Sequence, residues 1–125
     1  MDVLLIDDEP MVRKVVRKML ERQGHVVVEA ENGRVGLAEL RKNPFDLVIT
    51  DIVMPEVEGL EVLINVRQHY PSLPVVAMSG TGHALALGSL EFADKLGATA
   101  TLQKPFASDA LARAICLSCG HSMVA

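Results

Sequence analysis

Short apolar runs alternate along the chain with longer stretches in which apolar residues recur at helical spacing. Strands are predicted wherever such a run is four to six residues long and is bounded by turn-forming residues. This pattern predicts five strands, at residues 3–6, 25–30, 45–50, 75–78 and 98–102. The last of these segments is more polar than the others, which is typical of a strand at the edge of a sheet.

Helices are predicted between these strands. The clearest begins at Pro10, a residue suited to the first helical turn, and stops at Gly24. Four others are predicted through residues 35–40, 60–66 and 90–96 and from Ser108 to Cys119. The pairs Asn32-Gly33 and Asn43-Pro44 predict a turn and a loop.

The alternation of five strands with five helices determines the predicted fold class. Each crossover is long enough for a right-handed βαβ unit, so the strands should form a parallel sheet with helices on both faces. We therefore predict a doubly wound α/β domain. The 125 residues contain no repeat, linker or low-complexity segment, and we expect one domain over 1–125 with no output domain.

Composition narrows the function. Hydrophobic residues make up 50% of the chain but aromatic residues only 3%, so the core should be aliphatic. The net charge is −4 and there is no basic run, which argues against direct nucleic-acid binding. The apolar runs fall far short of the roughly 20 residues of a membrane helix. With no leader pattern at the N-terminus, we expect a cytoplasmic protein.

The two cysteines, Cys116 and Cys119, are expected to be reduced thiols. Together with His121 they suggest a zinc site, but such a site needs four ligands. The end of a helix followed by a tail of small residues explains them more simply.

Residues with reactive side chains follow the predicted strands. In a parallel sheet all carboxyl ends of the strands lie at one edge, where ligands bind. The residues at this edge are Asp7, Asp8 and Glu9 after the first strand, Asp51 after the third, Ser79 after the fourth and Lys104 beyond the fifth. Taken singly, each resembles an ordinary helix cap or surface residue, but their shared position favours a site.

Three of these carboxylates should lie close together. If the first and third strands are neighbours, about 4.8 Å apart, Asp7, Asp8 and Asp51 repel one another unless a cation is present. Mg²⁺ prefers such oxygen ligands, and Lys104 adds a fixed positive charge. The arrangement favours phosphoryl transfer to Asp51. Glu9 is interpreted as a charge in the first turn of a helix.

Four motifs carry a resemblance to a known family. They are Leu5-Ile6-Asp7-Asp8-Glu9-Pro10, Ile49-Thr50-Asp51-Ile52-Val53-Met54-Pro55 with Gly59, Met78-Ser79-Gly80, and Lys104-Pro105-Phe106. In order and spacing they resemble the receiver domain of two-component response regulators, including the chemotaxis-type single-domain regulators. The resemblance covers essentially the whole chain, and implies a flavodoxin-like sheet with strand order 2-1-3-4-5.

The resemblance also implies roles for individual residues. Asp51 would be the phosphoacceptor, and Mg²⁺ would be held by Asp7, Asp8, Asp51 and the backbone carbonyl of Val53. Ser79 and Lys104 would contact the phosphoryl group, and the bond between Lys104 and Pro105 would be cis.

The implied partners follow from the same family. The phosphodonor would be a sensor histidine kinase or a histidine phosphotransfer protein, and the domain would catalyse only its own phosphorylation and dephosphorylation. Phosphorylation would alter the face formed by the fourth helix, fifth strand and fifth helix, toward an unidentified effector. The domain would be a monomer or a weak, phosphorylation-dependent dimer.

Two positions depart from the family pattern. Thr101 stands where the family usually has the Tyr or Phe of its switch. Our hypothesis is that Ser79 still moves toward the phosphate, while residues 80–92 transmit more of the change than the fifth strand. Val53 places an apolar side chain beside the acceptor, where many relatives have a polar one.

Three other functions agree with parts of this pattern. A receiver-like docking module that binds its partner whatever its phosphorylation state is compatible with Thr101. A Mg²⁺-dependent aspartyl-phosphate hydrolase fits less well, because Val53 stands where a second acid is needed and no cap insertion is present. A flavin-binding electron carrier fits least, since an acidic loop after the first strand would repel the cofactor phosphate.

Overall fold

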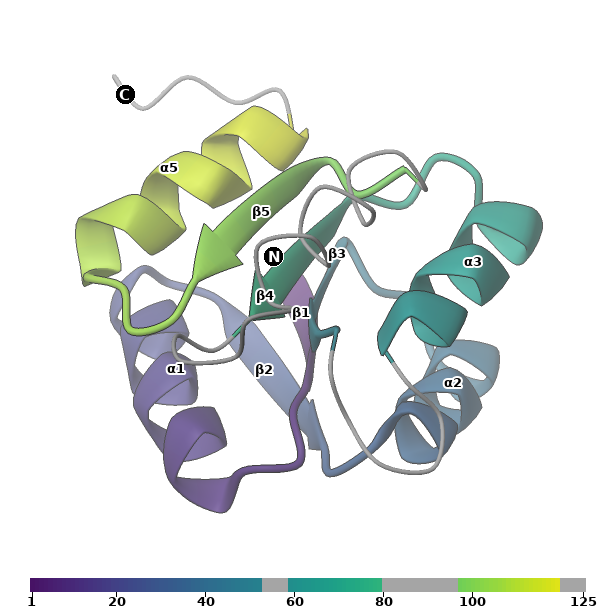
Figure 1. Ribbon diagram of the computed structural model, residues 1–125, viewed down its shortest axis with the longest axis horizontal. Coiled ribbons are helices and arrows are strands. Elements are labelled where there is room, and N and C mark those ends of the chain that lie inside the picture. The colour runs from purple at the N-terminus through teal and green to yellow at the C-terminus, as the bar shows by residue number, and fades with distance from the viewer. Residues whose placement is uncertain (53–58, 80–96, 120–125) are drawn as a thin grey trace.

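A computed structural model describes residues 1–52, 59–79 and 97–119 of the chain. Within these residues the elements are β1 (Asp2–Ile6), α1 (Pro10–Arg22), β2 (Val26–Ala30), α2 (Gly33–Lys42), β3 (Leu47–Asp51), α3 (Gly59–His69), β4 (Val75–Ser79), β5 (Ala100–Gln103) and α5 (Ser108–Cys119). The strands form one parallel sheet in the order β2-β1-β3-β4-β5 (Figure 1). The predicted fold class and strand order are confirmed. The helix expected at 90–96 lies outside the described residues.

The helices cover the sheet on both sides. Helices α1 and α5 lie on one face and α2 and α3 on the other (Figure 1). Side chains of β1 alternate between the two cores: Val3 and Leu5 pack with α1 and α5, whereas Leu4 and Ile6 pack with α2 and α3. Every residue of β3 and β4 is buried, which explains why each strand is apolar up to the polar residues at its carboxyl end. No helix in the described part of the chain is long and apolar enough to cross a membrane.

The pair Asn32-Gly33 begins a helix, which corrects the predicted turn. The side-chain oxygen of Asn32 accepts a hydrogen bond from the backbone N–H of Val35 at 2.9 Å, so Asn32 is the N-cap of α2. Asn is favoured both in turns and at helix N-caps because its side chain satisfies nearby backbone donors. The local sequence alone therefore did not distinguish the two structures.

The fifth strand begins two residues later than predicted, at Ala100. The hydroxyl of Thr99 accepts a hydrogen bond from the N–H of Val75 at 2.7 Å and lies 2.8 Å from its carbonyl oxygen. The side chain therefore takes the backbone N–H of Val75, whereas the carbonyl of Val75 still accepts a hydrogen bond from the backbone N–H of Thr99 at 2.8 Å. The strand is an edge strand, as expected, because β5 pairs only with β4 in this sheet.

A close contact between α2 and β1 lies directly below the acidic edge of the sheet. A Cβ atom added to Gly36 would lie 2.4 Å from Cδ1 and 2.8 Å from Cγ1 of Ile6. Ile6 is fully buried and immediately precedes Asp7. The absence of a side chain at Gly36 therefore allows the helix to approach the strand that carries the first acidic residue.

We expect Gly36→Val to destabilise the domain by about 1–3 kcal/mol, because the larger side chain overpacks the contact with Ile6. Ile6→Val removes the nearest atom, Cδ1, and alone should cost about 0.5–1.5 kcal/mol. Urea unfolding of the natural chain, both single variants and the double variant measures the coupling. The double variant should lose less than the sum of the single losses, and strictly additive losses would contradict the contact.

Candidate functional site

The strand register brings the predicted site residues to one edge of the sheet. Ile6 of β1 pairs with Thr50 of β3, and Ser79 of β4 pairs with Gln103 of β5. Asp7, Asp51 and Lys104 therefore stand at or just beyond the carboxyl ends of their strands. The buried polar residues in the described part of the chain are Asp7, Thr50, Asp51, Ser79 and Lys104. Four of these five were predicted as site residues.

Lys104 forms the centre of this site. Its Nζ atom lies 2.7 Å from Oδ2 of Asp7 and 2.7 Å from Oδ2 of Asp51, and its side chain is 10% exposed. Burial acts to lower the pKa of Lys104, but hydrogen bonds and charges from Asp51 and Asp7 outweigh it, so the pKa is raised. The ammonium therefore remains protonated and neutralises part of the negative charge.

Asp7 is held by contacts on all of its polar groups. Its Oδ1 accepts a hydrogen bond from the N–H of Glu9 at 2.9 Å, while Oδ2 binds Lys104. Its backbone N–H donates to the carbonyl of Ala30 at 3.1 Å, and its own carbonyl accepts from Arg13 at 2.7 Å. The orientation of this carboxylate is therefore set before any ligand arrives.

Four carboxylates converge beside Lys104. One oxygen from each of Asp7, Asp8, Glu9 and Asp51 lies within 4.8 Å of the others, with Asp7 and Asp51 buried and the remaining two exposed. Because one ammonium faces four carboxylates, negative charge is in excess. A hard divalent cation such as Mg²⁺ fits a donor set made only of oxygen. The carbonyl of Val53, also expected as a ligand, lies outside the described residues.

Glu9 belongs to this group of carboxylates, although its place in the sequence indicated a charge in the first turn of a helix. It is the N-cap residue of α1, and its side chain makes no capping hydrogen bond. Its Oε1 lies 3.9 Å from Nζ of Lys104. The sequence signal was its position directly after Asp8 in the loop leaving β1, but an acid there serves a helix terminus equally well.

Ser79 has an unused hydroxyl at the same edge. The residue is 1% exposed, and its Oγ has no hydrogen-bond partner among the described residues. Its backbone carbonyl accepts from the N–H of Lys104 at 2.7 Å, which ties the end of β4 to the lysine. Buried hydroxyls usually have partners, so this one is available to a group entering the site.

Thr101 and the bond before Pro105 complete the predicted set. Thr101 is exposed on β5, opposite Ala77 of β4, and does not join the buried group. The peptide bond between Lys104 and Pro105 is cis, the isomer that the resemblance implies. Residues 80–92, which our switch hypothesis invokes, lie outside the described part of the structure.

An apolar groove of about 250 Å³ is formed by α1 and the segment from Lys104 to Phe106. Its lining consists of Met11, Val12, Val15, Val16, Met19, Lys104, Pro105 and Phe106. Met11 is 73% exposed and Val15 is 50% exposed, so two neighbouring apolar side chains of α1 face solvent in this groove. Lys104 belongs both to the lining of this groove and to the acidic site, so the groove lies next to the site.

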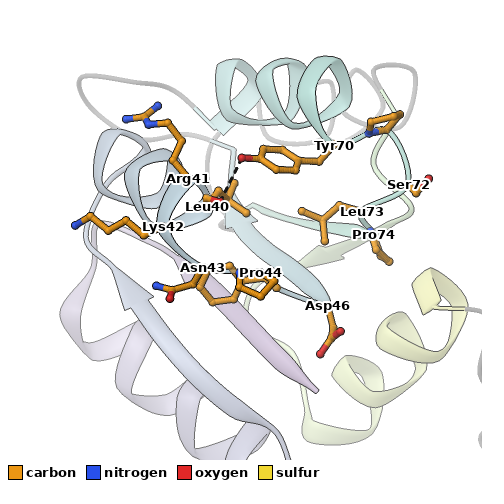
Figure 2. A pocket seen from close by; sticks show the side chains of 12 residues that line it. Leu40, Arg41, Lys42, Asn43, Pro44, Asp46, Tyr70, Ser72, Leu73 and Pro74 are labelled. Carbon is orange, nitrogen blue, oxygen red and sulfur yellow. Dashed lines mark hydrogen bonds between the residues drawn. The ribbon is translucent and has the colours of Figure 1, made fainter.

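A wider cavity of about 780 Å³ lies at the opposite edge of the sheet, formed by segments that precede β3 and β4. Figure 2 shows Arg41 and Lys42 extending away from Leu73 and Pro44. The hydroxyl of Tyr70 donates to the carbonyl of Leu40 at 3.2 Å (Figure 2). The charged side chains do not converge here, so size alone does not locate the chemistry.

Comparison with known proteins agrees with this geometry. Residues 3–116 match the family model described as the response regulator receiver domain. The transcriptional regulatory protein GlrR of Escherichia coli strain K12 is 34% identical over 113 residues, which cover 90% of this chain. A protein-glutamate methylesterase/protein-glutamine glutaminase of Trichodesmium erythraeum is 36% identical over 105 residues, or 82% of this chain. The chain spans only 25% and 30% of the lengths of these relatives.

Solved structures give the same result. The receiver domain of NtrX from Brucella abortus superposes with a TM-score of 0.88 at 30% identity, covering 97% of this chain and 100% of the other. A response regulator receiver domain protein from Clostridium thermocellum superposes with a TM-score of 0.87, also at 30% identity, covering 95% and 94%. The likeness therefore extends over nearly the whole fold.

The charge balance at Lys104 is testable. We expect Lys104→Met to cost about 3–5 kcal/mol of unfolding free energy in EDTA, because it removes the ammonium shared by two buried carboxylates. Lys18→Met, on the exposed side of α1, should change it by no more than about 0.5 kcal/mol.

Urea unfolding with and without Mg²⁺ measures both effects. Mg²⁺ should stabilise Lys104→Met more than the natural chain, because the added cation replaces part of the lost positive charge. Equal stability of Lys104→Met and the natural chain in EDTA would contradict this account.

Proposed function

Because the chain belongs to the response regulator receiver domain family, we propose that it is a phosphorylation switch whose acceptor is Asp51. The observation that carries the proposal is the position of Lys104, whose ammonium lies 2.7 Å from both Asp51 and Asp7. Asp51 is a buried carboxylate beside an ammonium, and three more carboxylates have an oxygen within 4.8 Å of its own. Such a site is suited to the transfer of a negatively charged phosphoryl group that needs a divalent ion. A docking module would not require this arrangement.

In the proposed step, a carboxylate oxygen of Asp51 attacks the phosphorus of a phosphohistidine. The phosphorus–nitrogen bond breaks, the imidazole nitrogen keeps the electron pair, and the product is an aspartyl phosphate. Mg²⁺, when bound by the acidic group, neutralises charge on the transferred oxygens. Lys104 compensates part of the added negative charge, and the Ser79 hydroxyl donates a hydrogen bond to a phosphoryl oxygen.

The donor is proposed to be a helix of a sensor histidine kinase or a histidine phosphotransfer protein. The apolar groove along α1 supports this choice, because its lining includes Lys104 together with the exposed side chains of Met11 and Val15. An amphipathic helix of the donor would lie with its apolar face in this groove, and a phosphohistidine at the border of that face would be on the side of Lys104 and the acidic residues. The groove therefore gives a docking surface that small phosphodonors do not need.

The output is proposed to pass through the face that includes β5 and α5. A shallow cavity of about 440 Å³ is lined there by residues of both elements, among them Thr101, Arg113 and Leu117. Leu117 is 76% exposed, so an apolar side chain is available to an effector or to a second phosphorylated copy. GlrR is a transcriptional regulatory protein and the second relative an esterase, so the effector's chemistry differs among relatives.

Labelling with acetyl phosphate tests the acceptor. In Mg²⁺ the natural chain should gain one phosphoryl group by intact mass, and Asp51→Asn should gain none because it lacks the nucleophilic carboxylate. Asp109→Asn, at an exposed aspartate of α5, should label like the natural chain. An adduct that persists in Asp51→Asn would exclude this acceptor, and no adduct on the natural chain would favour the docking module.

The double variant Met11→Gln with Val15→Gln tests the groove without changing its charge. We expect phosphotransfer from a histidine kinase to slow by roughly tenfold, since two exposed apolar contacts are lost. Labelling by acetyl phosphate should stay within about twofold. The kinase would be the one that labels the natural chain fastest among the kinases of the same organism.

Leu117→Gln is the matched control, because Leu117 is equally exposed and apolar but lies on α5. Its kinase rate should equal that of the natural chain. Equal slowing by both phosphodonors in the groove variant would mean that the substitutions damage the acidic site rather than docking.

A further inference from the structure

A group of charged side chains joins α1 to β2 beside the acidic edge. Glu29 of β2 binds two arginines of α1: its Oε1 lies 3.3 Å from Nε of Arg13, and its Oε2 lies 2.7 Å from Nη1 of Arg17. Arg17 also lies 3.4 Å from Glu21. Two guanidinium groups and two carboxylates therefore neutralise one another.

Only Arg13 extends from this group to the acidic site. Its Nη1 donates to the backbone carbonyl of Asp7 at 2.7 Å, and its side chain is 16% exposed, against 40% for Arg17. This carbonyl belongs to the peptide that links Asp7 to Asp8. Arg13 therefore fixes the plane of the peptide from which the next acidic residue projects.

The loop after β1 depends on this contact for its shape. On its other side, Oδ1 of Asp7 accepts from the N–H of Glu9 at 2.9 Å. Asp8 is exposed, so the position from which its side chain projects is set by the backbone on either side of it and not by packing. The two hydrogen bonds together hold the segment so that three of its carboxylate oxygens lie within 4.8 Å of one another and of Asp51.

We propose that Arg13 is a positioning residue for the divalent cation, acting through the carbonyl of Asp7. Glu29 holds the guanidinium in place and cancels its charge, so the loop gains a rigid hydrogen bond without an uncompensated cation beside a cation site. The inference rests on the proposed Mg²⁺-dependent function, and it adds a residue outside the group of ligands. Such supporting contacts typically change metal affinity by 10–100-fold when they are removed.

Loss of the positive charge and loss of the hydrogen bond to Asp7 predict opposite effects of Arg13→Ala on Mg²⁺ affinity. Removing a nearby positive charge should by itself strengthen Mg²⁺ binding, because less repulsion opposes the ion. Removing the hydrogen bond to Asp7 should weaken binding, because the loop must be ordered when the ion binds. The sign of the change therefore distinguishes a positioning residue from a simple surface charge.

The test is a Mg²⁺ titration of ¹⁵N-labelled protein followed by NMR. For Arg13→Ala we expect the dissociation constant to rise about tenfold, equivalent to about 1.4 kcal/mol. The amide signals of Asp8 and Glu9 should also shift before any Mg²⁺ is added. Arg13→Lys keeps the charge and one donor, and should recover part of the affinity.

Arg17→Ala is the matched control. Arg17 lies on the same helix, binds the same Glu29 and carries the same charge, but it does not contact Asp7. Its dissociation constant should stay within about twofold of the natural value, with the Asp8 and Glu9 signals unmoved. Thermal unfolding in EDTA establishes whether each variant is folded. If Arg13→Ala is unfolded, the Mg²⁺ affinity of Arg13→Lys is compared with that of Arg17→Ala instead.

The outcomes separate this inference from the proposed function. If the natural chain binds Mg²⁺ and Arg13→Ala binds equally well or more tightly, positioning by Arg13 is wrong and the phosphorylation switch is unaffected. Equal weakening in Arg17→Ala would also overturn it, because the effect would then belong to the charged group as a whole. If the natural chain binds no Mg²⁺, both proposals fail.

Discussion

The ammonium of Lys104 lies 2.7 Å from a carboxylate oxygen of each of two buried aspartates, Asp7 and Asp51. Buried carboxylates are strongly unfavourable unless a cation and hydrogen bonds accompany them. In the sequence Lys104 is 97 positions from Asp7 and 53 positions from Asp51. The ion pairs can therefore form only if the carboxyl ends of β1, β3 and β5 meet at one edge of the sheet. The parallel strand order satisfies this condition, and the ion pairs of the site therefore depend on the topology of the fold.

The end of β4 makes the connection across the sheet. β5 pairs with β4 and not with β3, so Lys104 has to extend past β4 to contact Asp51. The backbone N–H of Lys104 donates to the carbonyl of Ser79 at 2.7 Å, which fixes where the lysine leaves the strand. The hydroxyl of Ser79, which has no hydrogen-bond partner in the described part of the chain, therefore lies on the strand that Lys104 crosses, and a group arriving at Asp51 would enter beside both.

Much of the fold could be predicted because burial and sequence pattern agree. β3 and β4 are buried along their whole length, and each consists of an apolar run that ends in polar residues at the carboxyl end of the strand. The reactive residues directly follow these runs, so the parallel topology places them at one edge without any knowledge of side-chain contacts. Asp7, Asp51, Ser79 and Lys104 could therefore be found from the sequence.

Residues whose roles depend on a contact in three dimensions could not be found in this way. Arg13 resembles any other arginine of an amphipathic helix until its distance to the carbonyl of Asp7 is known. Glu9 is equally suited to a helix terminus and to an ion site, and only the convergence of four carboxylates separates these roles. The same ambiguity led to the incorrect turn at Asn32, where one side-chain chemistry serves two local structures.

The position of Lys104 also limits how a change at Asp51 could reach the surface. On the proposed mechanism, a phosphoryl group adds negative charge to Asp51 and alters the balance by which the ammonium is shared with Asp7. Lys104 lies between β5 and α5, and Phe106, two residues later, packs into the core formed with α1 and α5. Thr101 is exposed and has no ring to move inward. Within the described residues, the direct covalent route from the site to α5 is therefore the backbone that leads from Lys104 through Phe106 to Ser108, where α5 begins.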